Sequence, residues 1–326
     1  MSYFYLQGLL YSIEKRFPRA AHLERMLEAP TLEAALQVLK DTEYQMVIRD
    51  DEPAGHFNDL VFRHLQRVLE MFRHYTNRPN FAELLALEFD LLELNDVVLG
   101  VHVDHLPGTL MALAQTKLKE YDEILHSDRI RVRSTFATDA KRYLGEIHVS
   151  HVRERAGRET AVLQAYYHRG FKLAKLLRSA FIRDYFKYEI DVLNLMTLAK
   201  QHSYNFIPAG VGLPFLEGGE IDRATFDNIR KDIISNLKQY GRLLGNRAER
   251  AIAAYVNGDP VENLEREMAR ARLEKIESAK HHTFTAARIF GYWKEEVMYA
   301  DLIRMILTAK ASGVAAPLTR QMVFAV

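Results

Sequence analysis

Four side chains near the middle of the chain have the types and spacing that a metal site requires. Glu123 and His126 stand three residues apart, which is the Glu-x-x-His spacing of di-metal helical bundles. His148 and His151 show the same interval, and they would share a face only if that segment is helical. Such a bundle needs a second Glu-x-x-His motif and two further carboxylates. The cluster therefore remains the alternative hypothesis, a helical metal- or substrate-binding enzyme.

Other motifs that carry chemistry are missing from the sequence. It has no G-x-x-x-x-G-K-[ST] phosphate loop and no G-x-S-x-G nucleophile elbow. The glycines of AGVGLPFLEGG follow no predicted strand, so a turn or linker is favoured over a nucleotide fingerprint. The chain has no cysteine, which excludes disulfides, cysteine nucleophiles and thiolate metal sites. We predict no catalytic residue, no metal and no cofactor.

A short basic segment is the only candidate for binding phosphate or nucleic acid. Arg129, Arg131 and Arg133 alternate in RIRVR, but the acidic EYDEILHSD comes directly before them. The whole chain has 44 basic and 43 acidic residues, so its net charge of +1 gives no field that would attract nucleic acid. A solvated or salt-bridged edge is the favoured interpretation. A helical nucleic-acid scaffold is a further alternative, and we predict no nucleic-acid partner.

The sequence gives no sign of a membrane span. No apolar run approaches the roughly 20 residues that cross a bilayer. The N-terminal MSYFYLQGLLYSIEKRF has no basic residue ahead of its apolar part and no small-residue cleavage site, so we expect no signal peptide. Any membrane association is therefore predicted to go through a partner.

Helical signals dominate the elements that would position these residues. Thr31 is a predicted N-cap, and Asp259, Pro260 and Glu262 predict a second helix start with a capping box. Residues 160–203 predict one or two long helices with a break at Gly170. Two short alternating segments, RIRVRST and EIHVSHVRE, are the only strand signals. The sequence predicts a nearly all-α protein.

One helical pattern occurs three times. Each copy has an acid, a polar residue five positions later, apolar residues four positions before and after that polar residue, and a Gly/Pro break downstream. The acids are Asp90, Glu189 and Glu296; the polar residues are Asn95, Asn194 and Asp301; the apolar residues are Leu91, Ile190, Val297, Leu99, Leu198 and Met305. The copies lie 99 and 107 residues apart. This predicts three related helical lobes, residues 1–108, 109–212 and 213–326.

Asn194 raises a specific question, because it interrupts an apolar stripe. Ile190 and Leu198 lie one turn below and above it on the same helical face. A buried amide without a partner costs about 1–3 kcal/mol. We therefore expect the three repeated polar residues to be buried against the same kind of partner, such as a helix end or loop backbone. The alternative is that all three point to a shared axis and touch another protein.

The repeated helices also resemble a known family. DYFKYEIDVLNLMTLAK followed by GLPFLEGGEIDRATF is similar to the second-lobe helix and glycine turn of the family of C subunits of V-type/A-type rotary ATPases, to which the eukaryotic d subunits are related. The matching residues are Glu189, Asn194, Leu195, Lys200, Leu216, Gly218 and Gly219. The segment IFGYWKEEVMYADLIRMILTAKASG resembles the last helix of the family through Tyr292, Lys294, Glu296, Arg304, Ile306, Lys310 and Gly313.

The first lobe matches through LELNDVVLGV and LPGTL, without the lysine that follows in the second lobe. The third lobe departs at Ala300 and Asp301, where the family usually has an asparagine pair or Asn-Leu/Ile/Val. The resemblance implies a funnel of three pseudo-symmetric lobes. It implies a non-catalytic rotor adapter on the cytoplasmic face of the proteolipid (c/K) ring. Its partners would be that ring and the central stalk subunits D and F, with no direct membrane span.

Overall fold

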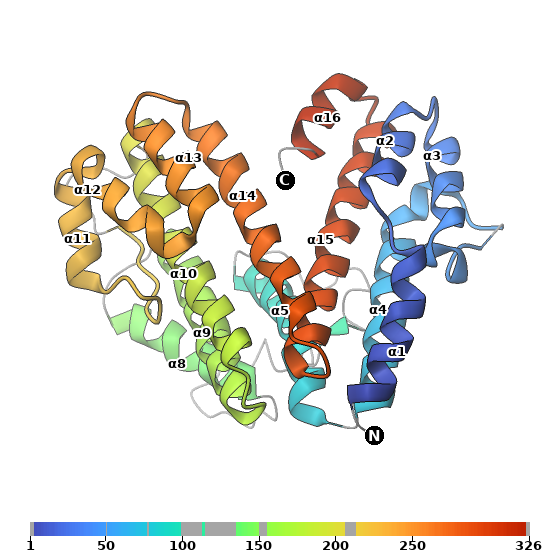
Figure 1. The fold of residues 1–326 in the computed structure, drawn as a ribbon, viewed down its shortest axis with the longest axis horizontal. Coiled ribbons are helices and arrows are strands. Elements are labelled where there is room, and N and C mark those ends of the chain that lie inside the picture. The colour runs from blue at the N-terminus through green and yellow to red at the C-terminus, as the bar shows by residue number, and fades with distance from the viewer. Residues whose placement is uncertain are drawn as a thin grey trace. The chain divides into compact units, whose positions relative to one another are not determined.

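The computed structural model describes residues 3–49, 51–76, 78–98, 113–114, 135–149, 155–205 and 213–323 (Figure 1). These residues contain helices and no strand, so the all-α prediction is confirmed. The α-helices are α1 Tyr3–Ile13, α2 Ala20–Glu28, α3 Leu32–Val38, α4 Phe57–Thr76, α5 Pro79–Val98, α8 Thr135–Val149, α9 Arg155–Leu176, α10 Ala180–Tyr204, α11 Arg223–Lys231, α12 Ile233–Tyr240, α13 Asn246–Val256, α14 Val261–Glu277, α15 Ala286–Ala311 and α16 Ala316–Val323. The 3-10 helices are η1 Glu14–Arg16, η2 Leu39–Asp41, η3 Glu43–Met46, η4 Ala54–His56, η6 Gly241–Leu244 and η7 Ser278–His281.

Neither strand signal forms a strand where the structure describes it. Residues 129–134 and 150–154 lie outside the described residues. The EIHV part of the second signal belongs to α8. That helix buries Ala137, Ala140 and Leu144, whose intervals of three and four place them on one helical face. No helix in the described ranges combines the length and the apolar character needed to cross a bilayer.

The chain divides into two compact units. Unit 1 comprises Met1–Ala86, Leu106–Leu113 and Ile276–Val326, and unit 2 comprises Leu87–His105 and Ala114–Lys275. The three-lobe division at residues 108 and 212 stays a prediction. The longest described helix of unit 1 is α15, and that of unit 2 is α10.

Unit 1 is built around α15 (Figure 1). The first twelve residues of α15 are all buried. Helices α2, α3, α4 and α16 contact it. Aromatic rings fill the junction with α4: Phe72 meets the Tyr292 ring at 6.0 Å and the Trp293 ring at 6.3 Å, both edge-on. A helix that is buried on every side has to carry its polar residues into the interior, and α15 does so with Glu296.

Unit 2 is built around α10. Its C-terminal half belongs to a hydrophobic core with residues of α11 to α14, among them Phe226, Leu237, Ile252 and Leu264. Helix α9 packs along its N-terminal half. The tyrosine and phenylalanine rings of this junction meet edge-on, as Tyr166 and Phe186 do at 5.8 Å.

Gly170 does not break the helix, contrary to the prediction. Helix α9 continues to Leu176, and a Cβ on Gly170 would lie 2.7 Å from the Phe186 ring of α10. The glycine therefore permits a close approach of two helices. The chain turns at Arg178, which has a φ of +53°, and the Ser179 N–H bonds the Ala174 carbonyl at 3.0 Å. This is the bonding of a left-handed C-cap, in which glycine is the usual residue.

The predicted helix starts have two outcomes. The Thr31 hydroxyl accepts a hydrogen bond from the Ala34 N–H at 3.1 Å, so the N-cap of α3 is confirmed. Helix α14 begins at Val261, one residue later than predicted. Pro260 precedes the helix as its N-cap residue, because its carbonyl accepts the first helical hydrogen bonds. The Glu262 carboxylate accepts a hydrogen bond from the Tyr204 hydroxyl at 2.6 Å.

Candidate functional site: buried polar clusters on α10 and α15

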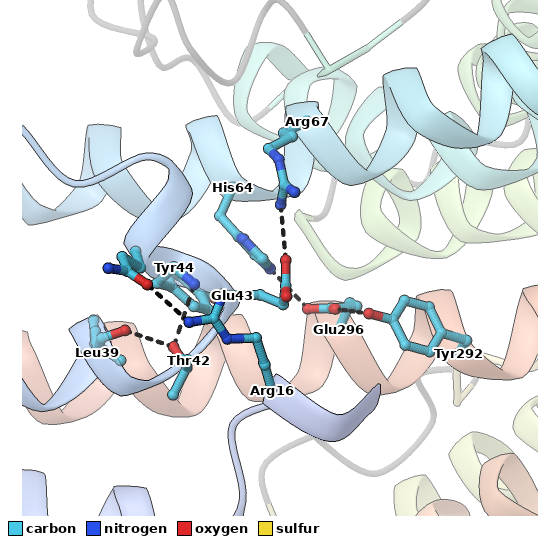
Figure 2. A network of polar contacts seen from close by, with 10 residues as sticks. Arg16, Leu39, Thr42, Glu43, Tyr44, His64, Arg67, Tyr292 and Glu296 are labelled. Carbon is cyan, nitrogen blue, oxygen red and sulfur yellow. Dashed lines mark hydrogen bonds and ion pairs between the residues drawn. The ribbon is translucent and has the colours of Figure 1, made fainter. Parts of the chain in front are cut away.

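A buried carboxylate, Glu296, lies at the centre of a polar cluster in unit 1 (Figure 2). Its side chain and that of His64 from α4 are both 0% exposed, and Glu296 Oε2 lies 3.0 Å from His64 Nε2. The Tyr292 hydroxyl, one turn earlier on α15, donates to Glu296 Oε1. The carboxylate thus joins helices that are more than 200 residues apart in sequence.

The surroundings of His64 determine which ring nitrogen carries the proton of the neutral imidazole. They also keep the phenols of Tyr44 and Tyr292 neutral. The imidazole stacks on the Tyr44 ring at 3.9 Å, and its Nδ1 has no hydrogen-bond partner among the described residues. A neutral His64 therefore places its proton on Nε2, where it donates to Glu296. Burial, and then the Glu296 charge, raise the pKa of Tyr44 and of Tyr292 well above the usual value. Tyr292 therefore remains a hydrogen-bond donor.

A short turn positions Tyr44 over the imidazole. The Thr42 hydroxyl donates to the Leu39 carbonyl at 2.7 Å and accepts from the Tyr44 N–H at 3.2 Å. Glu43 lies 3.2 Å from Arg67, which is one turn after His64 on α4 (Figure 2). Adjacent residues of η3 therefore hold α4 by an ion pair and by a ring stack.

An analogous carboxylate, Glu189, is buried in unit 2 on α10. The Tyr185 hydroxyl, one turn earlier, donates to it at 2.7 Å, and Arg272 of α14 lies 3.9 Å away. Helices α10 and α15 thus share a tyrosine four residues before a buried glutamate. Our sequence reasoning missed these tyrosines. The signal that could have found them is the spacing Tyr-x-x-x-Glu, which the first copy lacks because position 86 is alanine.

The amide of Asn194 pairs with the backbone of a loop. Its Nδ2 donates to the Leu216 carbonyl at 2.9 Å, and its Oδ1 accepts from the Leu216 N–H at 2.9 Å. The N–H and the carbonyl of Leu216 are thus both hydrogen-bonded to the asparagine, which is 2% exposed. The polar residue in the apolar stripe therefore anchors the loop before α11 to α10.

Two further side chains hold the same loop, and the sequence reasoning missed both. Asp191 accepts from the N–H groups of Glu220 at 2.9 Å and Ile221 at 3.1 Å. Gln164 of α9 accepts from the Glu217 N–H at 2.8 Å and donates to its carbonyl at 3.1 Å. Burial raises the pKa of Asp191, and its two N–H bonds offset part of that rise. We call Gln164, Asp191 and Asn194 the loop clamp.

The predicted glycine turn lies inside the loop clamp. Gly218 has a φ of +108°, a left-handed conformation that favours glycine, and it packs on Phe171. Gly219 faces Asp191 so closely that any Cβ would overlap Asp191 Oδ1. The two glycines therefore have different roles. Gly218 permits a left-handed backbone conformation, and Gly219 permits the close approach of the loop to the Asp191 carboxylate.

Gly219→Ala is expected to lower the free energy of unfolding by about 1–3 kcal/mol, because the new methyl group displaces the Asp191 carboxylate from its two N–H donors. Denaturant unfolding measures this loss. The loss should shrink in an Asp191→Ala background, where the overlapping oxygen is gone. Equal losses in both backgrounds would contradict the clash. Gly8→Ala is the control, because its Cβ would meet nothing within 4 Å on α1.

The other repeated positions do not all share the setting of Asn194. Asp90 is 1% exposed and Asn95 is half-buried. The Asp301 side chain is 65% exposed and lies 3.4 Å from Arg304, so the expectation of a buried partner is wrong there. The buried residues of that part of α15 are Leu302, Ile303, Ile306 and Leu307, a stripe that turns Asp301 outward.

Most of the predicted metal cluster cannot be compared with the structure. Glu123, His126 and His151 lie outside the described residues, as do Arg129, Arg131 and Arg133. His148 belongs to α8, but its side chain lies outside the described part.

One group of metal-ligand type occurs in the described ranges. The ligand atoms of Glu52, His56 and Asp59 lie within 4.8 Å of one another. Glu52 is already bound by Arg63, whose Nη1 lies 2.8 Å from Oε1. That guanidinium lowers the pKa of Glu52 and competes with a cation for its oxygens.

Comparison with known proteins supplies a family. The model of a protein family described as ATP synthase (C/AC39) subunit matches residues 6–322. No curated protein matches the chain. The family match spans both compact units, and it covers both buried carboxylates and the loop clamp.

Proposed function

Because the chain belongs to the ATP synthase (C/AC39) subunit family, we propose that it is the non-catalytic adapter of the central rotor in a V/A-type ATPase. In this role it sits on the cytoplasmic face of the proteolipid (c/K) ring, binds stalk subunits D and F, and takes part in ATP-linked ion transport. It is peripheral to the membrane and held there by the ring. The observation that carries the proposal is the family match from residue 6 to residue 322.

The buried clusters support a mechanical role. An adapter that passes torque must resist deformation, and close packing with satisfied buried polar groups favours one rigid arrangement. In unit 1, Glu296 links α15 to α4 through His64. In unit 2, Asn194 and Asp191 fix a loop onto α10 through four hydrogen bonds. Each long helix is thus bound to distant segments by groups that have few alternative partners.

The repeated pattern supports three lobes, which we place at residues 1–108, 109–212 and 213–326 and which would form a funnel. The three repeated acids Asp90, Glu189 and Glu296 are all buried, at 1%, 7% and 0% exposure. Two of them also share the tyrosine one turn earlier. A buried carboxylate at the same place in three segments favours one bundle design used three times.

Reconstitution tests the proposed function. Purified proteolipid ring and purified stalk subunits D and F are mixed with or without this protein, and co-migration of stalk with ring is measured. We expect the stalk to bind the ring only when the protein is present. Stalk binding that is equal in its absence would overturn the proposal. An unrelated helical protein of similar size serves as the control for nonspecific bridging.

A further inference from the structure

Two tyrosines of unit 1 bring their rings together at its surface. Tyr5 lies in α1 and Tyr75 lies near the C-terminal end of α4, and these two helices contact each other (Figure 1). The ring centroids are 5.2 Å apart, and the ring planes are tilted by 41°. Tyr5 is 56% exposed and Tyr75 is half-buried, so small molecules in solution have access to both rings. We call Tyr5 and Tyr75 the tyrosine pair.

The two phenols are also hydrogen-bonded to each other. The bond to the Tyr5 hydroxyl raises the pKa of Tyr75 above its usual value, as expected when the neutral Tyr75 phenol is the donor. A hydrogen bond between two phenol hydroxyls brings together the ring carbons beside them, which are the ortho carbons. Exposed side chains change rotamer within picoseconds to nanoseconds, so the ortho carbons can meet without a movement of either helix.

The composition of the chain directs one-electron oxidation to tyrosine. Thiolates are the protein groups that oxidants attack most readily, and the chain has no cysteine. Its single tryptophan, Trp293, is 1% exposed. Methionine is oxidised by uptake of an oxygen atom, which is a two-electron reaction. Accessible phenols are therefore the groups from which a one-electron oxidant in solution takes electrons.

We propose that the tyrosine pair is an oxidative cross-linking site, at which a one-electron oxidant joins Tyr5 to Tyr75 as dityrosine. Each phenol gives one electron to the oxidant and its hydroxyl proton to water. The unpaired electron of each tyrosyl radical is shared with its ortho carbons, and a carbon–carbon bond forms between one ortho carbon of each ring. The hydrogens on those two carbons then move to the oxygens, which restores both phenols. Each cross-link thus costs the protein two electrons and two protons.

A phenol partner and access to solvent occur together in the tyrosine pair but not in three other tyrosines. Tyr11 of α1 is 59% exposed, but it has no ring contact among the described residues. Tyr166 and Tyr167 of α9 meet at 5.0 Å, but they are only 5% and 3% exposed. An oxidant in solution is therefore expected to join Tyr5 to Tyr75 within one molecule and to leave Tyr11 without an intramolecular partner.

The cross-link would connect α1 covalently to α4. It closes a loop between residues 5 and 75 that contains α2 and α3. Closing a loop lowers the conformational entropy of the unfolded chain and so favours the folded state. Opening of α1 away from α4 should become rarer, which is seen as slower hydrogen exchange of the α1 amides. None of these steps depends on the proposed function.

The test is photo-oxidation of the dilute full-length protein with ruthenium(II) tris-bipyridyl and persulfate, in which photogenerated ruthenium(III) is the one-electron oxidant. We expect a monomeric product that is lighter by two hydrogen atoms, shows dityrosine fluorescence and contains residues 5 and 75 joined in one peptide pair. Tyr5→Phe and Tyr75→Phe should each abolish this product, because phenylalanine keeps the ring but has no hydroxyl to oxidise. Tyr11→Phe is the matched control on the same helix and should leave the product unchanged.

Hydrogen exchange measures the effect of the cross-link on the fold. The α1 amides should exchange more slowly in the oxidised wild-type monomer than in the untreated protein. Tyr75→Phe that has received the same treatment should show no such slowing, which separates the cross-link from other oxidation. Two single variants at different helices keep the test open if one of them is poorly folded.

Three results would overturn the inference. The first is a wild-type protein that gives only cross-links between molecules, or none. The second is monomeric dityrosine that survives Tyr5→Phe or Tyr75→Phe, because it would join other phenols. The third is a loss of the product in Tyr11→Phe equal to the loss in Tyr5→Phe. The proposed function stands or falls separately, since it is tested by binding of the stalk to the ring.

Discussion

Glu296→Leu is expected to lower the free energy of unfolding by about 3–5 kcal/mol, the largest effect predicted for any single substitution in this chain. The change removes the only acceptor seen for His64 Nε2 and for the Tyr292 hydroxyl among the described residues. Both partners remain buried, at 0% exposure each, and cannot reach water. A buried donor that loses its acceptor forfeits its full hydration energy. Denaturant unfolding with a shared slope measures the loss.

A pair of companion variants locates the cause. Tyr292→Phe removes one of the two donors, so the double variant Tyr292→Phe/Glu296→Leu should lose less than the sum of the single losses. Glu296→Gln keeps an oxygen acceptor and should lose less than Glu296→Leu. Additive losses, or a loss below about 1 kcal/mol for Glu296→Leu, would show that His64 and Tyr292 do not depend on this carboxylate.

Asn194→Leu is expected to lower the free energy of unfolding by about 2–4 kcal/mol. The leucine fits the apolar stripe between Ile190 and Leu198, but it leaves the N–H and the carbonyl of Leu216 without partners. Asp191 and Gln164 still hold the loop, so the protein should remain folded. Denaturant unfolding gives the magnitude.

Hydrogen exchange shows where the loss occurs. The Leu216 amide should lose protection in Asn194→Leu, while the Glu220 amide, which is bound by Asp191, keeps it. Asp301→Leu is the matched control, because Asp301 aligns with Asn194 but is exposed; we expect a change within about 0.5 kcal/mol. A similar loss for both substitutions, or unchanged exchange at Leu216, would contradict the role of Asn194.

The two buried sites differ in how much the sequence revealed of them. Asn194 could be recognised as a group in need of a partner, because its neighbours at four-residue intervals are apolar. Glu296 could be placed in the same repeat. Neither His64 nor Leu216 could be assigned as the partner, since both lie far away in the chain and no local pattern marks them. Asp191 and Gln164 were missed for the same reason.

Two of the failed expectations have related causes. The sequence predicts a helix break at Gly170, because glycine has a low helix propensity. Packing against Phe186 overrides that propensity and uses the missing side chain instead. Asp301 aligns with two asparagines, but the buried stripe of α15 runs through Leu302 and Ile303 and leaves Asp301 in solvent. In both cases a neighbouring helix decided the role of the residue.

The sequence by itself determined the helical class, the cap at Thr31, the family resemblance and the presence of polar residues that need buried partners. These properties depend on composition and on periods of three to four residues, which are local. Only the tertiary structure decided that His64 meets Glu296, that the loop clamp holds Leu216, and that Asp301 faces solvent. These facts depend on which helix packs against which, and contacts between segments up to 232 residues apart leave no local trace in one sequence.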